Sequence, residues 1–152
     1  EGRKHPPVIR IPILHAVLRG GVRSVRRRSV TDSVNRILSA LSAVRVPAAP
    51  GEYDLHALIA AALDEAGIAY AHEAKLADGA RIDFLTGSVG IEVKKSRPER
   101  ARLLRQVDKY LACAEVDALI VVSQRAISLP AACRGKPVIL FTLNRLWGVS
   151  LP

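Results

Sequence analysis

The sequence predicts an α/β protein in which helices flank a mixed central sheet. Three observations favour this fold class. Residues 81–95 place two strand-like runs on either side of a Thr-Gly-Ser turn, a pattern typical of a β-hairpin. Residues 117–123 form an almost unbroken apolar run, which is typical of a strand buried on both faces of a parallel or mixed sheet. Residues 98–114 lie between these features and carry apolar residues at helical spacing, so they predict a crossover helix.

The first 50 residues are expected to form a basic arm and a helix. Residues 19–28 are rich in Gly and Arg and predict a flexible stretch, which either binds phosphates or only keeps the chain in solution. Residues 29–44 predict a helix whose apolar stripe must be buried on the main domain or on a second copy, and the second alternative would make a homodimer. The Pro-rich composition of residues 46–51 predicts a linker, which separates residues 1–50 from a main domain at residues 51–152.

The main domain is expected to alternate helices and strands. Ser96 is the predicted N-cap of its crossover helix, and one helical turn is expected near residues 130–133. The expected elements are, in chain order, a helix at residues 52–67, strands at 68–76, 81–85 and 89–95, a helix at 98–114, and strands at 117–123 and 137–143.

The hairpin brings three charged side chains to one face. If residues 87–88 form a two-residue loop, Asp83 faces Glu92 across the two strands, and facing residues point to the same side. Lys94 is two residues beyond Glu92 and therefore shares that side, while the same register makes Arg81 face Lys94. The apolar residues that then point to the opposite side, into a core, are Ile82, Phe84, Ile91 and Val93.

Two carboxylates directly opposite each other destabilise a sheet unless something offsets their repulsion. A divalent cation would do so, because Mg²⁺ takes oxygen ligands and keeps positions for water and phosphate oxygens. Lys94 beside that ion could hold or deprotonate an attacking water, or stabilise charge on a phosphate. These groups indicate metal-assisted phosphodiester hydrolysis with Mg²⁺ or Mn²⁺. The structural alternative is a solvated strand face with a Glu–Lys pair.

The motif Asp83, residues 84–91, then Glu92-Val93-Lys94 resembles the signature of the PD-(D/E)XK nuclease superfamily. Gln106 and Tyr110 resemble the Gln-x-x-x-Tyr element of its RecB-like and phage exonuclease-like branches. The resemblance covers about residues 52–143. It implies a restriction-endonuclease-like αβββαβ core, and it departs from the family pattern in having Ile82, not Pro, before the acid.

The resemblance also implies roles for individual residues. Asp83 and Glu92 would bind the metal with the Val93 carbonyl, and Lys94 would position or activate the water. Gln106 would orient water or a phosphate, Tyr110 would contact backbone, and both would border the active site. The structural alternative for that pair is a polar residue and an aromatic at the edge of the core.

Other acids and a histidine are weaker candidates for the site. In the resembled family a carboxylate on the first helix often completes the metal site, and Glu52 is the first choice and Asp54 the second. Compensation of the helix dipole explains either acid equally well. His56 could face the same cleft, although a lone helical histidine is more often structural. Glu73 is expected to be a surface residue of the first strand.

The charge balance bounds the function. The chain of 152 residues has a formal net charge of +9, which favours a polyanionic partner, and DNA, double-stranded or branched, is the expected one. No apolar run approaches the roughly 18 residues of a membrane span. With two cysteines and no Cys-x-x-Cys, a zinc site or disulfide framework is not expected, which fits the cytoplasm of a bacterial or phage-infected cell.

These observations favour a metal-dependent DNA endonuclease. An exonuclease and a Holliday-junction resolvase of the same fold remain alternatives within the enzyme class. A basic DNA-binding module that does not cut is the alternative outside it.

Overall fold

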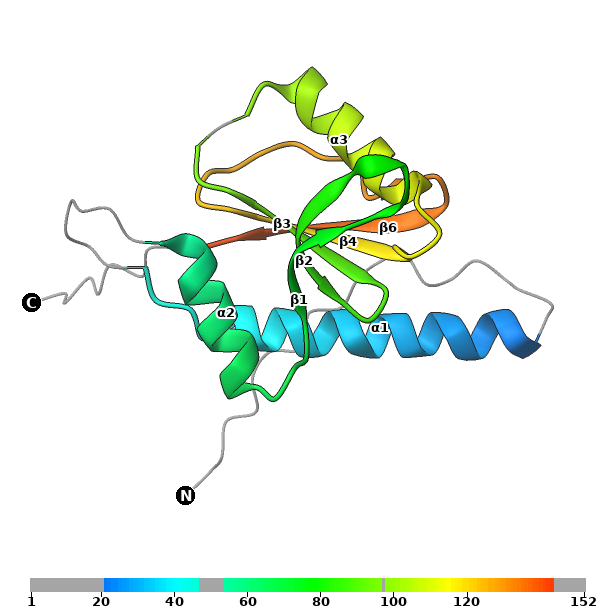
Figure 1. Ribbon diagram of the computed structural model, residues 1–152, viewed down its shortest axis with the longest axis horizontal. Helices are drawn as coiled ribbons and strands as arrows, with labels where there is room; N and C mark the ends of the chain where they lie inside the picture. Colours follow the sequence, from blue (N-terminus) through cyan, green and yellow to red (C-terminus); the bar gives the residue numbers. More distant parts are fainter. Residues whose placement is uncertain (1–20, 47–53, 97, 144–152) are drawn as a thin grey trace, which may run out of the picture.

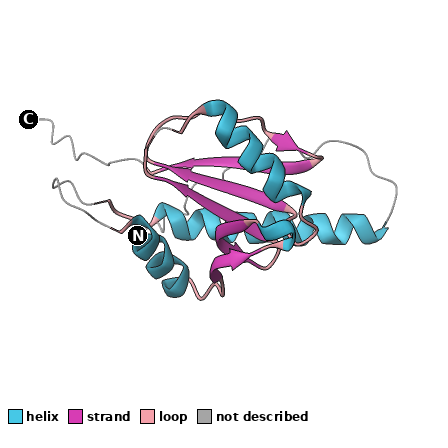
Figure 2. Cartoon of the chain, turned by 45° about the horizontal axis from the view of Figure 1, so that its top comes forward, coloured by secondary structure: helices cyan, strands magenta, loops and turns pink. Residues whose placement is uncertain are grey.

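The structure is a computed structural model that describes residues 21–46, 54–96 and 98–143. Its sheet is mixed, with the strand order β1-β2-β3-β4-β6-β5. The helices lie on both faces of the sheet, with α3 on one side and α1 and α2 on the other (Figures 1 and 2). The elements are α1 (Gly21–Ser42), α2 (Leu55–Glu65), β1 (Ala71–Lys75), a short 3-10 turn η1 (Ala77–Gly79), β2 (Arg81–Thr86), β3 (Val89–Lys94), α3 (Arg100–Ala112), β4 (Ala118–Ser123), β5 (Ala132–Cys133) and β6 (Lys136–Thr142).

The helix α1 packs against the same chain's sheet. Its apolar stripe includes Val34, Ile37 and Leu41, which are at most 1% exposed and share one hydrophobic cluster with α2, Phe84 and Ile91. Each Å² of apolar surface that is buried stabilises the fold by about 25 cal/mol, so this stripe is a major source of stability. The predicted stripe is therefore confirmed, and it is covered within the chain. Residues 47–53, where the domain boundary was expected, lie outside the described residues, as do residues 1–20.

The predicted flexible stretch at residues 19–28 is wrong for residues 21–28, because α1 begins at Gly21. Arg26 in this extension forms an ion pair with Asp117 at 3.0 Å, ahead of β4. Because both groups are partly exposed, that pair is worth at most about 1 kcal/mol. In the described part of the chain, no helix combines the length and the apolar character that crossing a membrane requires.

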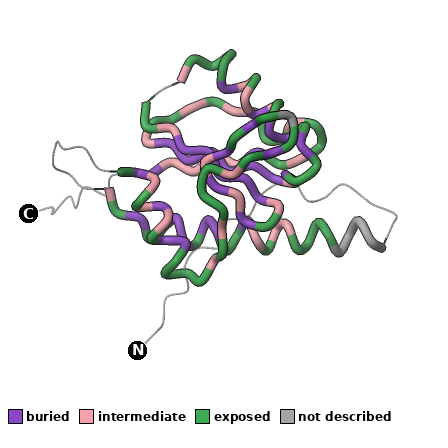
Figure 3. Tube along the Cα trace, viewed as in Figure 1, coloured by how far each residue is buried: buried purple, intermediate pink, exposed green. Residues whose placement is uncertain are grey.

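The other face of the sheet is covered by α3. Leu103, Val107 and Leu111 are each 1% exposed and pack with β4 residues in a second hydrophobic cluster. Figure 3 shows how the buried segments gather along the central strands and the inner sides of the helices. The helix begins later than predicted, because Glu99, not Ser96, is its N-cap.

The strand β4 confirms the predicted central position. All of its residues are buried, and it pairs in parallel with β3 and with β6. The helical turn expected near residues 130–133 is wrong, because Ala132 and Cys133 form β5 and pair with β6. A tight turn reverses the chain there, with Arg134 and Gly135 at φ of +53° and +73°.

The hairpin register is confirmed near the turn and fails farther from it. Phe84 pairs with Ile91, as predicted, but no pairing of β2 with β3 continues beyond those two residues. Ile82 lies in the α3-side cluster, although alternation would place it with Phe84 on the other face. The strand β2 therefore changes face at Asp83.

The neighbouring strand β1 bends at the same level. Its pairing with β2 skips Glu73, whose φ of +49° lies in a region that non-glycine residues rarely adopt. On β3, Gly90 leaves room for the redirected Ile82, since a Cβ at Gly90 would collide with Cδ1 of Ile82. The pairing of β2 with β3 does not reach Arg81, so the predicted Arg81–Lys94 pairing is wrong, and Arg81 pairs with Lys75 of β1 on its other side.

Candidate active site

The site begins where β2 and β3 separate. Asp83 does not stand opposite Glu92 as predicted; instead its Oδ2 accepts a hydrogen bond of 2.7 Å from the backbone N–H of Val93. The Asp83 carboxylate thus accepts the hydrogen bond that a backbone carbonyl of a paired strand would otherwise accept from Val93. Because the N–H and C=O of one strand residue point to the same side, the Val93 carbonyl faces this gap too. Two of the predicted oxygen donors, Asp83 and the Val93 carbonyl, therefore lie at the opening between the strands, and Glu92 precedes Val93 on β3.

Glu92 is the buried centre of the site. Its side chain is 6% exposed, and three donors from β3 and α3 surround the carboxylate. Lys94 Nζ lies 2.6 Å and Gln106 Nε2 lies 2.8 Å from Oε1, while the Tyr110 hydroxyl lies 3.0 Å from Oε2. A carboxylate accepts this many hydrogen bonds readily when it is ionised. The structure thus brings together Glu92, Lys94, Gln106 and Tyr110.

The α3 residues also contact one another, as their spacing predicted. Gln106 Nε2 lies 2.7 Å from the Tyr110 hydroxyl, which lies 2.8 Å from the backbone carbonyl of Arg81. A hydroxyl has one hydrogen, so Tyr110 donates to Glu92 or to Arg81 and accepts from Gln106. Tyr110 thereby connects α3, β2 and β3 at one point.

Burial shapes the acid–base properties of this cluster. Loss of solvent raises the pKa of Glu92 above its ordinary value, and the nearby charge of Asp83 raises it further, while Lys94 and Tyr110 act in the opposite direction. Loss of solvent also raises the pKa of Tyr110 far above its ordinary range, with the Glu92 charge adding to the effect. Tyr110 therefore acts as a neutral hydroxyl and not as a phenolate.

Two histidines adjoin Asp83 on the α2 side. His56 Nε2 lies 3.8 Å from Asp83 Oδ2, and His56 Nδ1 lies 3.1 Å from Nε2 of His72. The His72 ring packs on Phe84, with the ring centroids 4.8 Å apart. Sequence reasoning considered His56 but missed His72. The signal was the register of β1, which pairs His72 with Phe84 and so turns it toward α2.

The weaker acidic candidates have structural partners. Asp54 is the N-cap of α2, and its Oδ1 accepts hydrogen bonds from the backbone N–H groups of His56 and Ala57 at 2.9 and 3.3 Å. Glu73 is an exposed residue that pairs with Arg81 at 2.9 Å, as expected of a surface position. Glu52, the first choice for a further ligand, lies outside the described residues.

The carboxylates fit a divalent cation in part. Asp83 Oδ1 accepts no hydrogen bond from a described residue, and the Val93 carbonyl faces the same opening. A cation would reach Glu92 Oε1 only if Lys94 or Gln106 gave up its contact. Among the residues that the structure describes, no three His, Cys, Asp or Glu side chains are grouped so as to hold a metal. The remaining positions would fall to water and phosphate oxygens, which suits Mg²⁺.

An open cleft of about 610 Å³ adjoins this cluster. Lys94 and Gln106 belong to its lining, so the cleft reaches the donors of Glu92. Most of the lining comes from α3 and the segment before it, and four of its five charged residues are basic. Comparisons with models of protein families, with curated proteins and with solved structures find no match to this chain.

Proposed function

We propose that this protein is a metal-dependent deoxyribonuclease that hydrolyses phosphodiester bonds within DNA strands. The observation that carries the proposal is the buried Glu92 carboxylate, held by Lys94 and Gln106 at the wall of a basic cleft and next to Asp83. A surface Glu–Lys pair would not be enclosed in this way. The order α2-β1-β2-β3-α3-β4 also agrees with the αβββαβ core that the PD-(D/E)XK resemblance implies.

The ligands of the cation would be Asp83, Glu92 and the Val93 carbonyl, which belong to the parts of β2 and β3 where the two strands separate. A bound Mg²⁺ or Mn²⁺ supplies Lewis-acid stabilisation of the charge that develops on the phosphate. Asp83 is already fixed for this role by its hydrogen bond to Val93. Glu92 is fixed on its other side by the Tyr110 hydroxyl.

Lys94 is the residue that faces the reacting phosphate. Its side chain is 20% exposed and lines the cleft, so the ammonium reaches both Glu92 and a bound substrate. In this position Lys94 donates hydrogen bonds to a phosphate oxygen or to the attacking water. Because Glu92 already holds the ammonium in place, Lys94 does not have to reorient during the reaction. Gln106 positions the Glu92 carboxylate, and Tyr110 positions both Gln106 and Glu92.

The test is a digestion panel of supercoiled, linear, flapped and four-way DNA with Mg²⁺ or Mn²⁺. We expect metal-dependent nicking of the supercoiled substrate, and we expect Asp83→Ala and Glu92→Ala to abolish it while DNA binding in EDTA is retained. Cleavage confined to linear DNA would establish an exonuclease, and selective cleavage of the four-way substrate a junction resolvase. If every substrate remains intact with both cations, the hydrolase proposal is wrong.

A basic DNA-binding module that does not cut is the second candidate. The specific observation in its favour is that three donors already occupy the Glu92 carboxylate without a cation. A ligand that binds only the folded state stabilises it by RT ln(1 + L/Kd), where L is the free ligand concentration. A binding module would therefore show no rise in Tm with Mg²⁺ or Mn²⁺, whereas the nuclease should show one that Asp83→Ala removes.

A further inference from the structure

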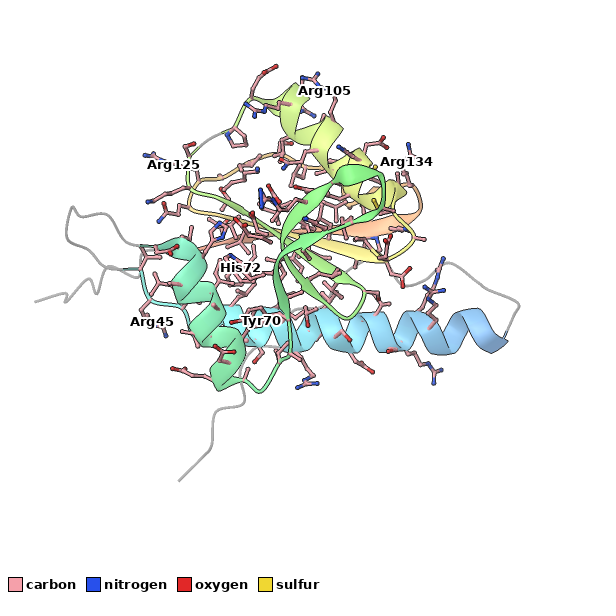
Figure 4. The ribbon with its side chains drawn as sticks, in the orientation of Figure 1. Arg45, Tyr70, His72, Arg105, Arg125 and Arg134 are labelled. Carbon is pink, nitrogen blue, oxygen red and sulfur yellow. The ribbon has the colours of Figure 1, made fainter. Side chains whose placement is uncertain are left out.

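The outer face of α3 carries an ordered row of cations. Arg102, Arg105 and Lys109 are exposed and are spaced three and four residues apart, so they lie on one side of the helix. At 1.5 Å per residue, the row extends about 10 Å along the helix axis. Figure 4 shows Arg105 on α3, at the side of the molecule away from α1. We call these three residues the α3 row.

The α3 row opens onto the candidate active site. All three of its residues line the cleft that also contains Lys94 and Gln106, whose side chains contact Glu92. The cations of the row therefore continue the positive potential of Lys94 outward along one wall. Glu99 is the acid among the described residues of that wall.

The α3 row differs in its partners from three other arginines of the protein. Arg26, Arg81 and Arg134 each form an ion pair with an acid of this chain. No described carboxylate pairs with a residue of the α3 row. The helix on the other side of the site, α2, contains no Lys or Arg in its sequence LHALIAAALDE. The charge for an anionic ligand is thus concentrated on the α3 wall.

We propose that the α3 row binds the phosphates of a DNA strand and leads that strand to Lys94. The row suits a phosphodiester backbone, because its charges repeat along one line and phosphates recur along a strand. Contacts to phosphates carry no sequence information, so we expect binding that does not depend on sequence. The proposal deepens the nuclease function and rests on it for the statement that the strand's phosphate reaches the Glu92 cluster.

The experiment measures DNA binding by fluorescence anisotropy with the full chain in EDTA, over a range of salt concentrations. The probes are a labelled oligothymidylate and a duplex of equal length. The test variant is Arg102→Gln/Arg105→Gln/Lys109→Gln. The matched control is Arg36→Gln/Arg45→Gln/Lys75→Gln, which removes the same charge from exposed positions that do not line the cleft. Circular dichroism and Tm establish that both variants are folded.

Each lost phosphate contact lowers the slope of log K against log salt by about 0.7 for a single strand and about 0.9 for a duplex. We therefore expect the α3 variant to lose a slope of about 2 on the single strand, or nearly 3 on the duplex if that is the better ligand. Affinity should fall by about a hundredfold at 0.1 M salt. The matched control should keep the slope within about 0.5 of the wild type.

An equal loss in the matched control would overturn the proposal, because it would show a response to net charge and not to the row. If polyglutamate displaces the labelled DNA as effectively as unlabelled DNA does, the assignment of the ligand as nucleic acid is wrong. If the wild-type protein cuts no DNA but the α3 variant loses DNA binding, the α3 row is supported and the nuclease function is refuted. Metal-dependent cleavage with an unchanged salt slope in the α3 variant would refute the row alone.

Discussion

Asp83 Oδ2 accepts a hydrogen bond of 2.7 Å from the backbone N–H of Val93, where a strand partner would otherwise stand. This contact keeps β2 and β3 apart without leaving the Val93 N–H unpaired. It also holds an acid in the gap next to the strand that carries Glu92. The opening of the hairpin and the placement of Asp83 next to the strand of Glu92 thus have one cause.

Tyr110→Phe removes the hydroxyl that joins α3 to β2 and β3. The Arg81 carbonyl and the Gln106 amide each lose a hydrogen-bond partner, and an unsatisfied buried polar group costs about 1–3 kcal/mol. We expect urea unfolding to show a destabilisation in that range. Tyr70→Phe is the control, because its hydroxyl contacts the exposed Asp64 at 3.3 Å and its loss should cost under about 0.5 kcal/mol. Equal stability of the two variants would contradict the account of Tyr110.

The raised pKa of Glu92 predicts a pH dependence of stability. Because burial raises this pKa in the folded state above the ordinary value of 4.5, the folded protein binds the proton more tightly than the unfolded chain. The resulting stabilisation is present below the ordinary pKa and is lost as the pH rises through the raised one.

Urea unfolding in EDTA between about pH 4 and pH 7 measures this effect. The free energy of unfolding of the wild type relative to Glu92→Gln should fall as the pH rises through that window. A relative free energy that stays level or increases would show that Glu92 does not carry a raised pKa in the folded protein.

Gly90→Ala tests the change of face in β2. The added Cβ collides with Ile82 Cδ1, so overpacking should destabilise the protein by about 1–3 kcal/mol. Ile82→Val removes that methyl group and should cost about 0.5–1.5 kcal/mol alone. In the double variant we expect the two losses to be less than additive. Full additivity in a double-mutant cycle would place Ile82 elsewhere.

Asp54→Ala should reduce stability and not activity. Loss of the N-cap of α2 costs about 1 kcal/mol, and Asp54→Asn should retain most of the capping. Both variants should nick plasmid at the wild-type rate at a temperature where they remain folded. Loss of cleavage in Asp54→Asn with normal stability would assign Asp54 to the metal site after all.

The sequence was sufficient to predict the layers and the hairpin near its turn. The period of two fixes which residues of β3 face α3, and residues 118–123 are apolar on both sides, so the central strand and its parallel neighbours follow. The spacing of Gln106 and Tyr110 likewise predicted that they meet, because residues four apart are neighbours on a helix.

The position of Asp83 could not be predicted, because strand alternation assumes a regular backbone. The chain departs from it at Glu73 and Asp83, where β1 and β2 bend together and Ile82 crosses to the other face. That bend depends on the space over Gly90, which is a long-range contact. The proximity of His72 to His56 is also a tertiary effect, since it requires α2 to dock on β1.

The most direct test of the central claim is the rate at which Lys94→Ala nicks supercoiled plasmid with Mg²⁺. Lys75→Ala is the matched control, because Lys75 is an exposed strand lysine on β1. Wild type and Lys75→Ala should cut at the same rate, and Lys94→Ala should be slower by about a hundredfold or more while remaining folded. Cleavage by Lys94→Ala at the wild-type rate would contradict the assignment of the Glu92–Lys94 cluster as the catalytic site.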